Sequence, residues 1–179
     1  MDAFDAIYTR RSIRKFKQQP IPLLILKKVV EAGRWAPTGA NLQYWRFLVI
    51  TEPHTLRMVK VVSPMYYGEG TAAVVVCLDM DAARSHGITL ASSEGPGFAG
   101  QNILLAAHAS GLGACPVKGF NKKALTEVLE IPPNLEPMLL ISLGYADETP
   151  EAKPRRPFSE THYLNSFKTP WREQDAQPK

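Results

Sequence analysis

Apolar residues recur at intervals of three and four along much of the chain, which is the period of a helix with one buried face. Asp2 can cap a short first helix in which Phe4, Ile7 and Tyr8 have this spacing. Pro22 suits the first turn of a second helix, which continues to about Trp35. The residues expected on its broad apolar face are Leu23, Leu26, Val29, Val30 and Gly33.

Two further helices have clear starting signals. Pro53 begins one that ends before Pro64, and Asn121 caps another that continues to about Leu129. Between the helices, apolar and β-branched runs predict strands at residues 45–51, 72–78 and 138–143. The run at 72–78 does not alternate with polar residues, which predicts a central strand buried on both faces. This order of elements predicts an α+β domain with a mixed sheet.

Residues 98–112 form a predicted helix of a different kind, because they are apolar on nearly every side. Glycines at its end suit a helix C-cap. A helix without a polar face must be covered all round, by the core or by another subunit. Its small residues would let a second helix approach closely, so we interpret it as the core helix of an obligate homodimer. These small residues are Ala99, Gly100, Ala106, Ala107 and Ala109.

The remaining segments are polar. Residues 79–93 are predicted to be an irregular surface segment whose conformation the sequence does not reveal. From residue 147 the chain is rich in proline yet carries four spaced aromatic residues, which favours an arm packed on a surface over a free linker. No repeat or linker divides the chain, so residues 1–179 are expected to form one domain, with 147–179 as a C-terminal arm. The four aromatic residues are Phe158, Tyr163, Phe167 and Trp171.

The composition excludes several classes of protein. With 179 residues, 45% of them apolar, the chain is long enough to bury a core. The net charge of +4 is modest and clustered, unlike the continuous basic stripe of a nucleic-acid-binding protein. Cys77 and Cys115 lie in apolar stretches, lack metal-ligand spacing and are expected to be buried free thiols. Without a signal peptide or membrane span, the protein is expected to be cytoplasmic, with no membrane partner.

Two basic clusters lie near opposite ends of the chain. The first occupies residues 10–15 and the second residues 153–156. Arginine presents a planar fork of donors that matches phosphate oxygens, and Ser12 can add a hydrogen bond. The two clusters could converge on one dianionic group if the fold brings them together. The alternative is two solvated basic patches.

Two loops are further candidates. Residues 36–45 combine a proline, a hydroxyl, a glycine and the carboxamides of Asn41 and Gln43, which suit the edge of a heterocycle; a turn with local hydrogen bonds is the alternative. Residues 114–120 follow a glycine pair and could direct backbone N–H groups at a planar ligand. The histidines form no nucleophile pattern, and His108 is interpreted as a core or interface residue.

Five segments, taken in order, resemble the nitroreductase family of FMN-dependent oxidoreductases. They are residues 10–16, 36–45, 101–113, 116–120 and 153–157, and the likeness extends from Phe4 to about Phe167. The resemblance implies a mostly antiparallel sheet flanked by helices, in an intertwined homodimer with two FMN sites at the subunit interface. It also implies that the C-terminal arm packs on the partner subunit.

The resemblance assigns roles to individual residues. Arg10, Ser12, Arg14, Lys153 and Arg155 would hold the FMN phosphate and ribityl chain. Residues 37–39 of the partner would pack on the flavin ring, and residues 116–119 would follow the ring with a backbone N–H directed at its N5. The full set of expected cofactor-binding residues is Arg10, Arg11, Ser12, Arg14, Pro37, Thr38, Gly39, Asn41, Gln43, Pro116, Val117, Lys118, Gly119, Lys153 and Arg155.

The chain departs from the family pattern at three places. Tyr44 replaces a common proline, Lys118 stands where a carboxylate is common, and residues 63–68 show no counterpart of the family's mid-chain flavin contact. The implied activity is hydride transfer from NADH or NADPH, through FMN, to a nitroaromatic, quinone or related small acceptor in a ping-pong cycle. The cofactor carries this chemistry, so no acid–base residue and no metal are expected. The alternatives are a flavin-binding protein without NAD(P)H turnover, which stores FMN or cleaves it, and a basic anion-binding module.

Overall fold

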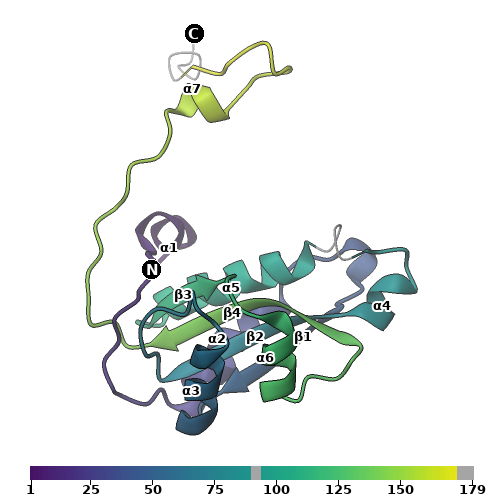
Figure 1. Cartoon of the computed structure of the whole chain (residues 1–179). Helices are drawn as coiled ribbons and strands as arrows, with labels where there is room; N and C mark the ends of the chain where they lie inside the picture. Colours follow the sequence, from purple (N-terminus) through teal and green to yellow (C-terminus); the bar gives the residue numbers. More distant parts are fainter. Residues whose placement is uncertain (90–93, 173–179) are drawn as a thin grey trace.

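A computed structural model describes residues 1–89 and 94–172, which are built around one four-stranded sheet (Figure 1). The strands are β1 (Trp45–Ile50), β2 (Ala72–Asp79), β3 (Gly113–Val117) and β4 (Leu135–Gly144), in the order β1-β2-β4-β3. The helices are α1 (Ala3–Thr9), α2 (Leu23–Arg34), the short η1 (Gly39–Asn41), α3 (Pro53–Val61), α4 (Met80–Arg84), α5 (Gly95–Ala109), α6 (Lys122–Val128) and α7 (Phe158–Thr161). All three strand pairings are antiparallel, which confirms the expected α+β class.

Strand β2 lies inside the sheet and is buried along its whole length, as its unbroken apolar run predicts. It pairs with β1 on one side, where Trp45 faces Leu78, and with β4 on the other, where Val75 faces Leu140. Alternate residues of the strand supply the two faces of the sheet.

Each face of the sheet has its own helical layer. Val29 of α2 and Ile103 of α5 pack with Val74 and Val76 on one face. Val59 of α3 and Leu125 of α6 pack with Val75 on the other. Burying each of these large side chains contributes roughly 1.5–3 kcal/mol.

Strand β3 is the main correction to the predicted elements, because residues 114–120 were expected to be a loop. Residues 113–117 instead pair with β4, with Pro116 opposite Ile141. Pro116 is tolerated there because β3 is the last strand in the sheet order. The N–H that a proline lacks would point away from β4, so no hydrogen bond between β3 and β4 is lost. A five-residue strand that begins with glycine and contains proline gives almost no strand signal in the sequence.

Three other predictions needed adjustment. Residues 80–84, expected to be irregular, form α4, because the carboxylate of Asp79 accepts hydrogen bonds from the N–H groups of Asp81 and Ala82. Residues 90–93 of the same predicted segment lie outside the described residues. Helix α5 begins at Gly95 rather than Phe98, since Pro96 fits its first turn. Leu23, expected on the apolar face of α2, is 72% exposed.

The small residues of α5 are mostly used within the chain. Ala99 and Ala107 are fully buried, and a Cβ on Gly100 would overlap the side chain of Leu139. They therefore allow α5 to lie close to the sheet. The side of α5 that remains open carries Phe98, which is 46% exposed, and Gln101.

Both ends of the chain stand away from the sheet (Figure 1). Helix α1 has the predicted cap, in which Asp2 Oδ1 accepts the Asp5 N–H at 2.8 Å, but Phe4 and Tyr8 stack on each other in solvent. After β4 the chain runs past α1 to α7, where Phe158 stacks on His162 with ring centroids 3.7 Å apart. A seven-residue helix such as α1, with exposed aromatic rings, has little stability of its own.

The N-terminus of α3 gives a prediction for pH dependence. Hydrogen bonds from the N–H groups of His54 and Thr55 lower the pKa of Glu52 from 4.5 to about 2. Because the pKa is depressed in the folded state, this stabilisation is present above pH 4.5 and is lost as the pH falls toward about 2. The difference in unfolding free energy between the wild type and Glu52→Ala, measured by urea denaturation, should therefore shrink over that range. A difference that stays constant with pH would contradict the capping role.

Candidate functional site

The first basic cluster lies on an extended segment that continues the sheet beyond β3. Ser12 forms a parallel bridge with Ala114, and the Ile13 N–H donates to the Ala114 carbonyl at 3.0 Å. Phe16 then forms an antiparallel bridge with Ala146, just after β4. The segment thus crosses from pairing with β3 to pairing with the chain after β4, which fixes its backbone at two points.

Arg10, at the end of α1, has an unusual environment for a guanidinium. Its Nε and Nη1 atoms are buried, and among residues 1–89 and 94–172 neither has a hydrogen-bond partner. Burial lowers the pKa of Arg10, and the charges of Arg11 and Arg155 lower it further. Buried donors without acceptors, surrounded by like charges, are unfavourable unless an anion completes the site. This arrangement fits a phosphate group.

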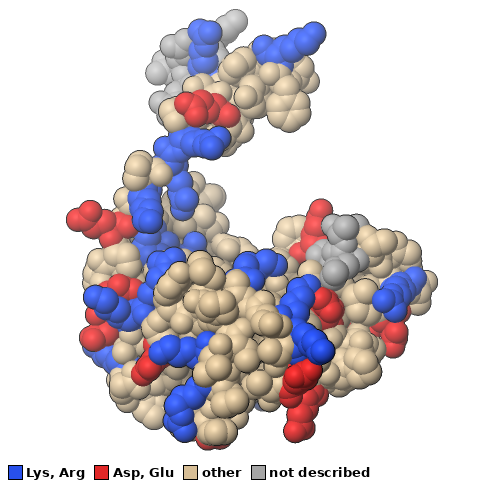
Figure 2. All heavy atoms as spheres, viewed as in Figure 1, with Lys and Arg blue, Asp and Glu red and all other residues tan. Residues whose placement is uncertain are grey.

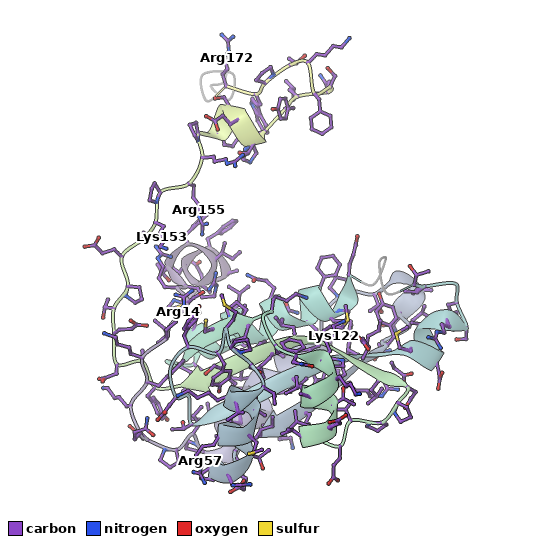
Figure 3. The ribbon with its side chains drawn as sticks, viewed as in Figure 1. Arg14, Arg57, Lys122, Lys153, Arg155 and Arg172 are labelled. Atoms are coloured by element: carbon purple, nitrogen blue, oxygen red, sulfur yellow. The ribbon has the colours of Figure 1, made fainter. Side chains whose placement is uncertain are left out.

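The second basic cluster reaches the same region. Lys and Arg side chains gather along the stalk where the chain leaves the sheet (Figure 2). Arg14 and Arg155, from opposite ends of the chain, both lie beside α1 (Figure 3), and the charge of Arg155 helps to lower the pKa of Arg10. Arg14, Lys153 and Arg155 lie beside α1, whereas Arg57 lies at the far end of the molecule (Figure 3). Lys153 and Arg155 are exposed, and so is Arg14, which leaves these side chains accessible to a ligand.

Arg11 differs from its neighbours. Its Nη1 donates to the carbonyls of Tyr8 and Arg10 at 2.7 and 2.8 Å, so it closes the end of α1. It also lines a cavity of about 490 Å³ together with His108, whose Nε2 is 2.8 Å from Thr9 Oγ1. Burial lowers the pKa of His108, and the positive charges of Arg10 and Arg11 lower it further. A neutral His108 therefore adds no charge to the basic cluster.

The loop that carries the two carboxamides is held in a strained conformation. Ala40, Asn41 and Gln43 all have positive φ, between 48° and 57°. The Gln43 N–H donates to Thr38 Oγ1 at 3.2 Å, which closes the loop, while Pro37 and the residues of η1 are exposed. Strain of this kind, about 1–3 kcal/mol per residue, is typical of functional sites. The loop presents its polar groups to the outside.

This loop lies far from the basic clusters within one chain. Tyr44, which follows it, packs beside Leu78 and Ala83 and next to Gly95, at the start of α5. The basic segment instead lies near the end of α5, where Ile13 contacts Gly113. At 1.5 Å per residue, the 15 residues of α5 separate the two regions by about 20 Å.

Residues 116–119 continue from the part of β3 that pairs with Ser12. The side chain of Val117 is buried in the core, so only its backbone can reach a ligand, while Pro116 is exposed. Lys118 Nζ donates to the carbonyl of Met138 at 2.8 Å, which holds this cation against β4. Gly119 lies directly against Met65, since an added Cβ would be 2.1 Å from Met65 Cγ.

Three residues near the site were missed from the sequence. Met65 and Gly68 belong to the mid-chain segment, and Glu148 lies in the predicted arm. A Cβ on Gly68, whose φ is +80°, would be 1.8 Å from the Arg14 carbonyl oxygen. The Glu148 carboxylate accepts the N–H groups of Arg14 and Lys15. None of the three gave a sequence signal, because contacts over such separations cannot be read from local patterns.

Comparison with known proteins gives the family. The sequence model of the Nitroreductase family matches residues 7–73 and 66–145. The chain belongs to the nitroreductase family. A relative from Methanothermobacter thermautotrophicus is 32% identical over an alignment of 159 residues that covers 84% of this chain and 80% of the relative. The NADPH-flavin oxidoreductase of Vibrio harveyi is 28% identical over 93% of this chain and 75% of its own.

Solved structures agree with this membership of the nitroreductase family. A nitroreductase family protein from Clostridium difficile superposes with a TM-score of 0.83 at 27% identity, covering 93% of this chain and 99% of its own. The NADPH:FMN oxidoreductase of Vibrio harveyi, solved in complex with NAD+, gives 0.82 at 26% identity, covering 92% and 77%. The resemblance inferred from the five sequence segments is therefore confirmed.

Three further observations concern the described residues. Within residues 1–89 and 94–172, no helix is both long and apolar enough to cross a membrane. In the same ranges no three His, Cys, Asp or Glu side chains are grouped so that they could hold a metal ion. Cys77 and Cys115 are free and buried.

Proposed function

We propose that this protein is an FMN-dependent NAD(P)H oxidoreductase. The observation that carries the proposal is the half-buried guanidinium of Arg10, whose buried Nε and Nη1 donors have no partner in the described residues. The charges of Arg11 and Arg155 act on the same guanidinium, which fits a phosphate dianion at this place. The name of the Vibrio harveyi relative, an NADPH-flavin oxidoreductase, supports the same cofactor class. When bound, FMN would supply the hydride and electron transfer that links NADH or NADPH to a nitroaromatic, quinone or similar acceptor in a ping-pong cycle. With free buried thiols, the proposed location is the cytoplasm.

The protein's own residues bind and orient the cofactor. Arg10, Ser12 and Arg14 would hold the phosphate from one side, and Lys153 and Arg155 from the arm. Guanidinium groups suit this task because they donate two parallel hydrogen bonds to phosphate oxygens. The backbone of residues 116–119 would hold the ring edge, and the side chain of Lys118 contributes nothing there while it binds the Met138 carbonyl.

The distance between the two halves of the proposed site supports a homodimer. The loop at residues 37–43 lies about 20 Å from the basic clusters along α5. If α5 packs antiparallel against α5 of a second copy, the end of one helix meets the start of the other, and two complete sites form by symmetry. The exposed rings of Phe4, Tyr8 and Phe98 would be covered in this dimer, and residues 147–179 of each chain would pack on the other.

The proposed dimer predicts the effect of charge on these rings. The double variant Phe4→Glu/Phe98→Glu should sediment as a monomer, whereas the wild type should have twice the mass of one chain. The control is Val61→Glu, which places one glutamate on a residue of α3 that is 76% exposed. A double variant that remains as dimeric as this control would contradict the interface.

The activity is tested by adding NADH or NADPH to the FMN-loaded protein without oxygen. We expect the visible absorbance of the flavin to bleach within the mixing time of a manual experiment and to return on addition of a quinone. Stable FMN binding without bleaching by either nucleotide would refute the reductase. It would favour the alternative of a flavin-binding protein without NAD(P)H turnover.

A further inference from the structure

We propose that Glu148 is a positioning residue for the anion site, and this inference rests on the proposed function. Its carboxylate Oε1 accepts the backbone N–H of Arg14 at 2.5 Å and that of Lys15 at 3.0 Å. One acidic side chain of the C-terminal arm thereby joins the arm to the segment that carries the first basic cluster. This role of Glu148 is not visible in the sequence, because more than 130 positions separate it from Arg14 and Lys15.

The position of these two hydrogen bonds explains why the carboxylate is needed. Before Arg14, the Ile13 N–H binds the Ala114 carbonyl of β3. After Lys15, the Lys17 N–H binds the Tyr145 carbonyl. Arg14 and Lys15 lie at the crossover between these two pairings, and Glu148 supplies the acceptor for both N–H groups. Hydrogen bonds to a charged acceptor are roughly twice as strong as neutral ones, so Glu148 fixes the crossover firmly.

The second connection at this point comes from the backbone of the arm. The Asp147 N–H donates to the Lys15 carbonyl at 2.9 Å, so two consecutive residues of the arm hold the crossover. Lys153 and Arg155 follow a few residues later. The direction in which the arm leaves the sheet, and hence the place where its cations meet those of the first cluster, depends on this attachment.

The charge of Glu148 acts in the opposite sense. Burial raises the pKa of the Cys115 thiol, and the charges of Arg14, Arg10 and Glu148 also act on this pKa. Glu148 therefore lies in the same electrostatic environment as the two arginines. A carboxylate this close to a dianion site repels the dianion, although less strongly where solvent screens it. The positioning role of Glu148 should therefore raise the affinity for FMN, whereas its charge should lower it. Substitutions of Glu148 can separate the two effects.

The test is the affinity of the flavin-free protein for FMN, followed by flavin fluorescence quenching, with inorganic phosphate as a competitor. Glu148→Ala should weaken FMN binding about tenfold, because the backbone of Arg14 and Lys15 loses the hydrogen bonds to a charged acceptor that hold it in place. Glu148→Gln keeps an acceptor oxygen and removes the charge, so it should bind FMN as tightly as the wild type or more tightly. Asp147→Ala is the matched control, because it removes an adjacent carboxylate that makes no hydrogen bond to the crossover in the described residues.

The outcomes are distinct. If Glu148→Ala binds FMN as tightly as Glu148→Gln, Glu148 acts only through its charge and the positioning role is wrong. If Glu148→Ala does not fold, Glu148→Asp replaces it, since the charge remains and the reach shortens; weaker binding supports the proposal and unchanged binding overturns it. Absence of FMN binding by the wild type would overturn the proposed function together with this inference.

Discussion

Gly68→Ala should destabilise the protein by about 3 kcal/mol or more and should also weaken FMN binding. Gly68 has a φ of +80°, which is unfavourable for any residue with a Cβ. The new Cβ would lie 1.8 Å from the carbonyl oxygen of Arg14 and 2.7 Å from its carbonyl carbon. Backbone atoms cannot move aside as a flexible side chain does, so the segment that carries Arg14 must shift. Thermal denaturation should show a fall in Tm of about 10 °C.

Gly87→Ala is the matched control for this substitution. Gly87 also has a positive φ, +70°, but nothing lies within 4 Å of an added Cβ. Its substitution should lower the unfolding free energy by only about 1–2 kcal/mol, from backbone strain alone, and leave FMN affinity unchanged. The difference between the two variants measures the overlap with Arg14. Equal destabilisation by both would show that the mid-chain segment does not hold the basic segment in place.

Arg10→Ala should weaken FMN binding by about a hundredfold or more, because a guanidinium–phosphate pair in a buried position contributes about 3 kcal/mol. The same substitution should leave the stability of the flavin-free protein unchanged or raise it. Two buried donors of Arg10 have no acceptor within the described residues, and Arg11 and Arg155 repel it. Fluorescence titration with FMN and urea denaturation of the flavin-free protein measure the two effects.

Arg57→Ala is the control for Arg10→Ala, since Arg57 is an exposed arginine of α3, at the far end of the molecule (Figure 3). It should change neither FMN affinity nor the dimer. A large loss of stability in flavin-free Arg10→Ala would instead show that Arg10 has a structural role and would contradict its assignment to the phosphate.

Local patterns predicted the elements that carry strong signals. The unbroken apolar run of β2 and the cap of α1 by Asp2 appear in the structure as expected. Strand β3 was missed because a strand can contain Gly113 and Pro116 when it lies at a sheet edge, and only the sheet order reveals that edge. Pairing with β4 therefore outweighs the low strand propensity of these residues.

The basic site was predictable in part for a similar reason. The anion-binding chemistry of an arginine is known from the residue type alone, so Arg10 and Arg155 could be proposed as partners for one anion. The contacts that position them could not be proposed, because Glu148 acts through backbone N–H groups and Gly68 acts through the space that it leaves empty. Neither property has a local pattern. The separation of the loop at residues 37–43 from the basic clusters became visible only once α5 was placed between them.

The most direct measurement compares the affinity of the flavin-free protein for FMN with its affinity for riboflavin, which has the same ring without the phosphate. If cations from the two ends of the chain surround one phosphate, FMN should bind at least about a hundredfold more tightly. The ratio should fall as ionic strength rises, because salt screens charged contacts. Equal binding of the two flavins at low salt would contradict the account.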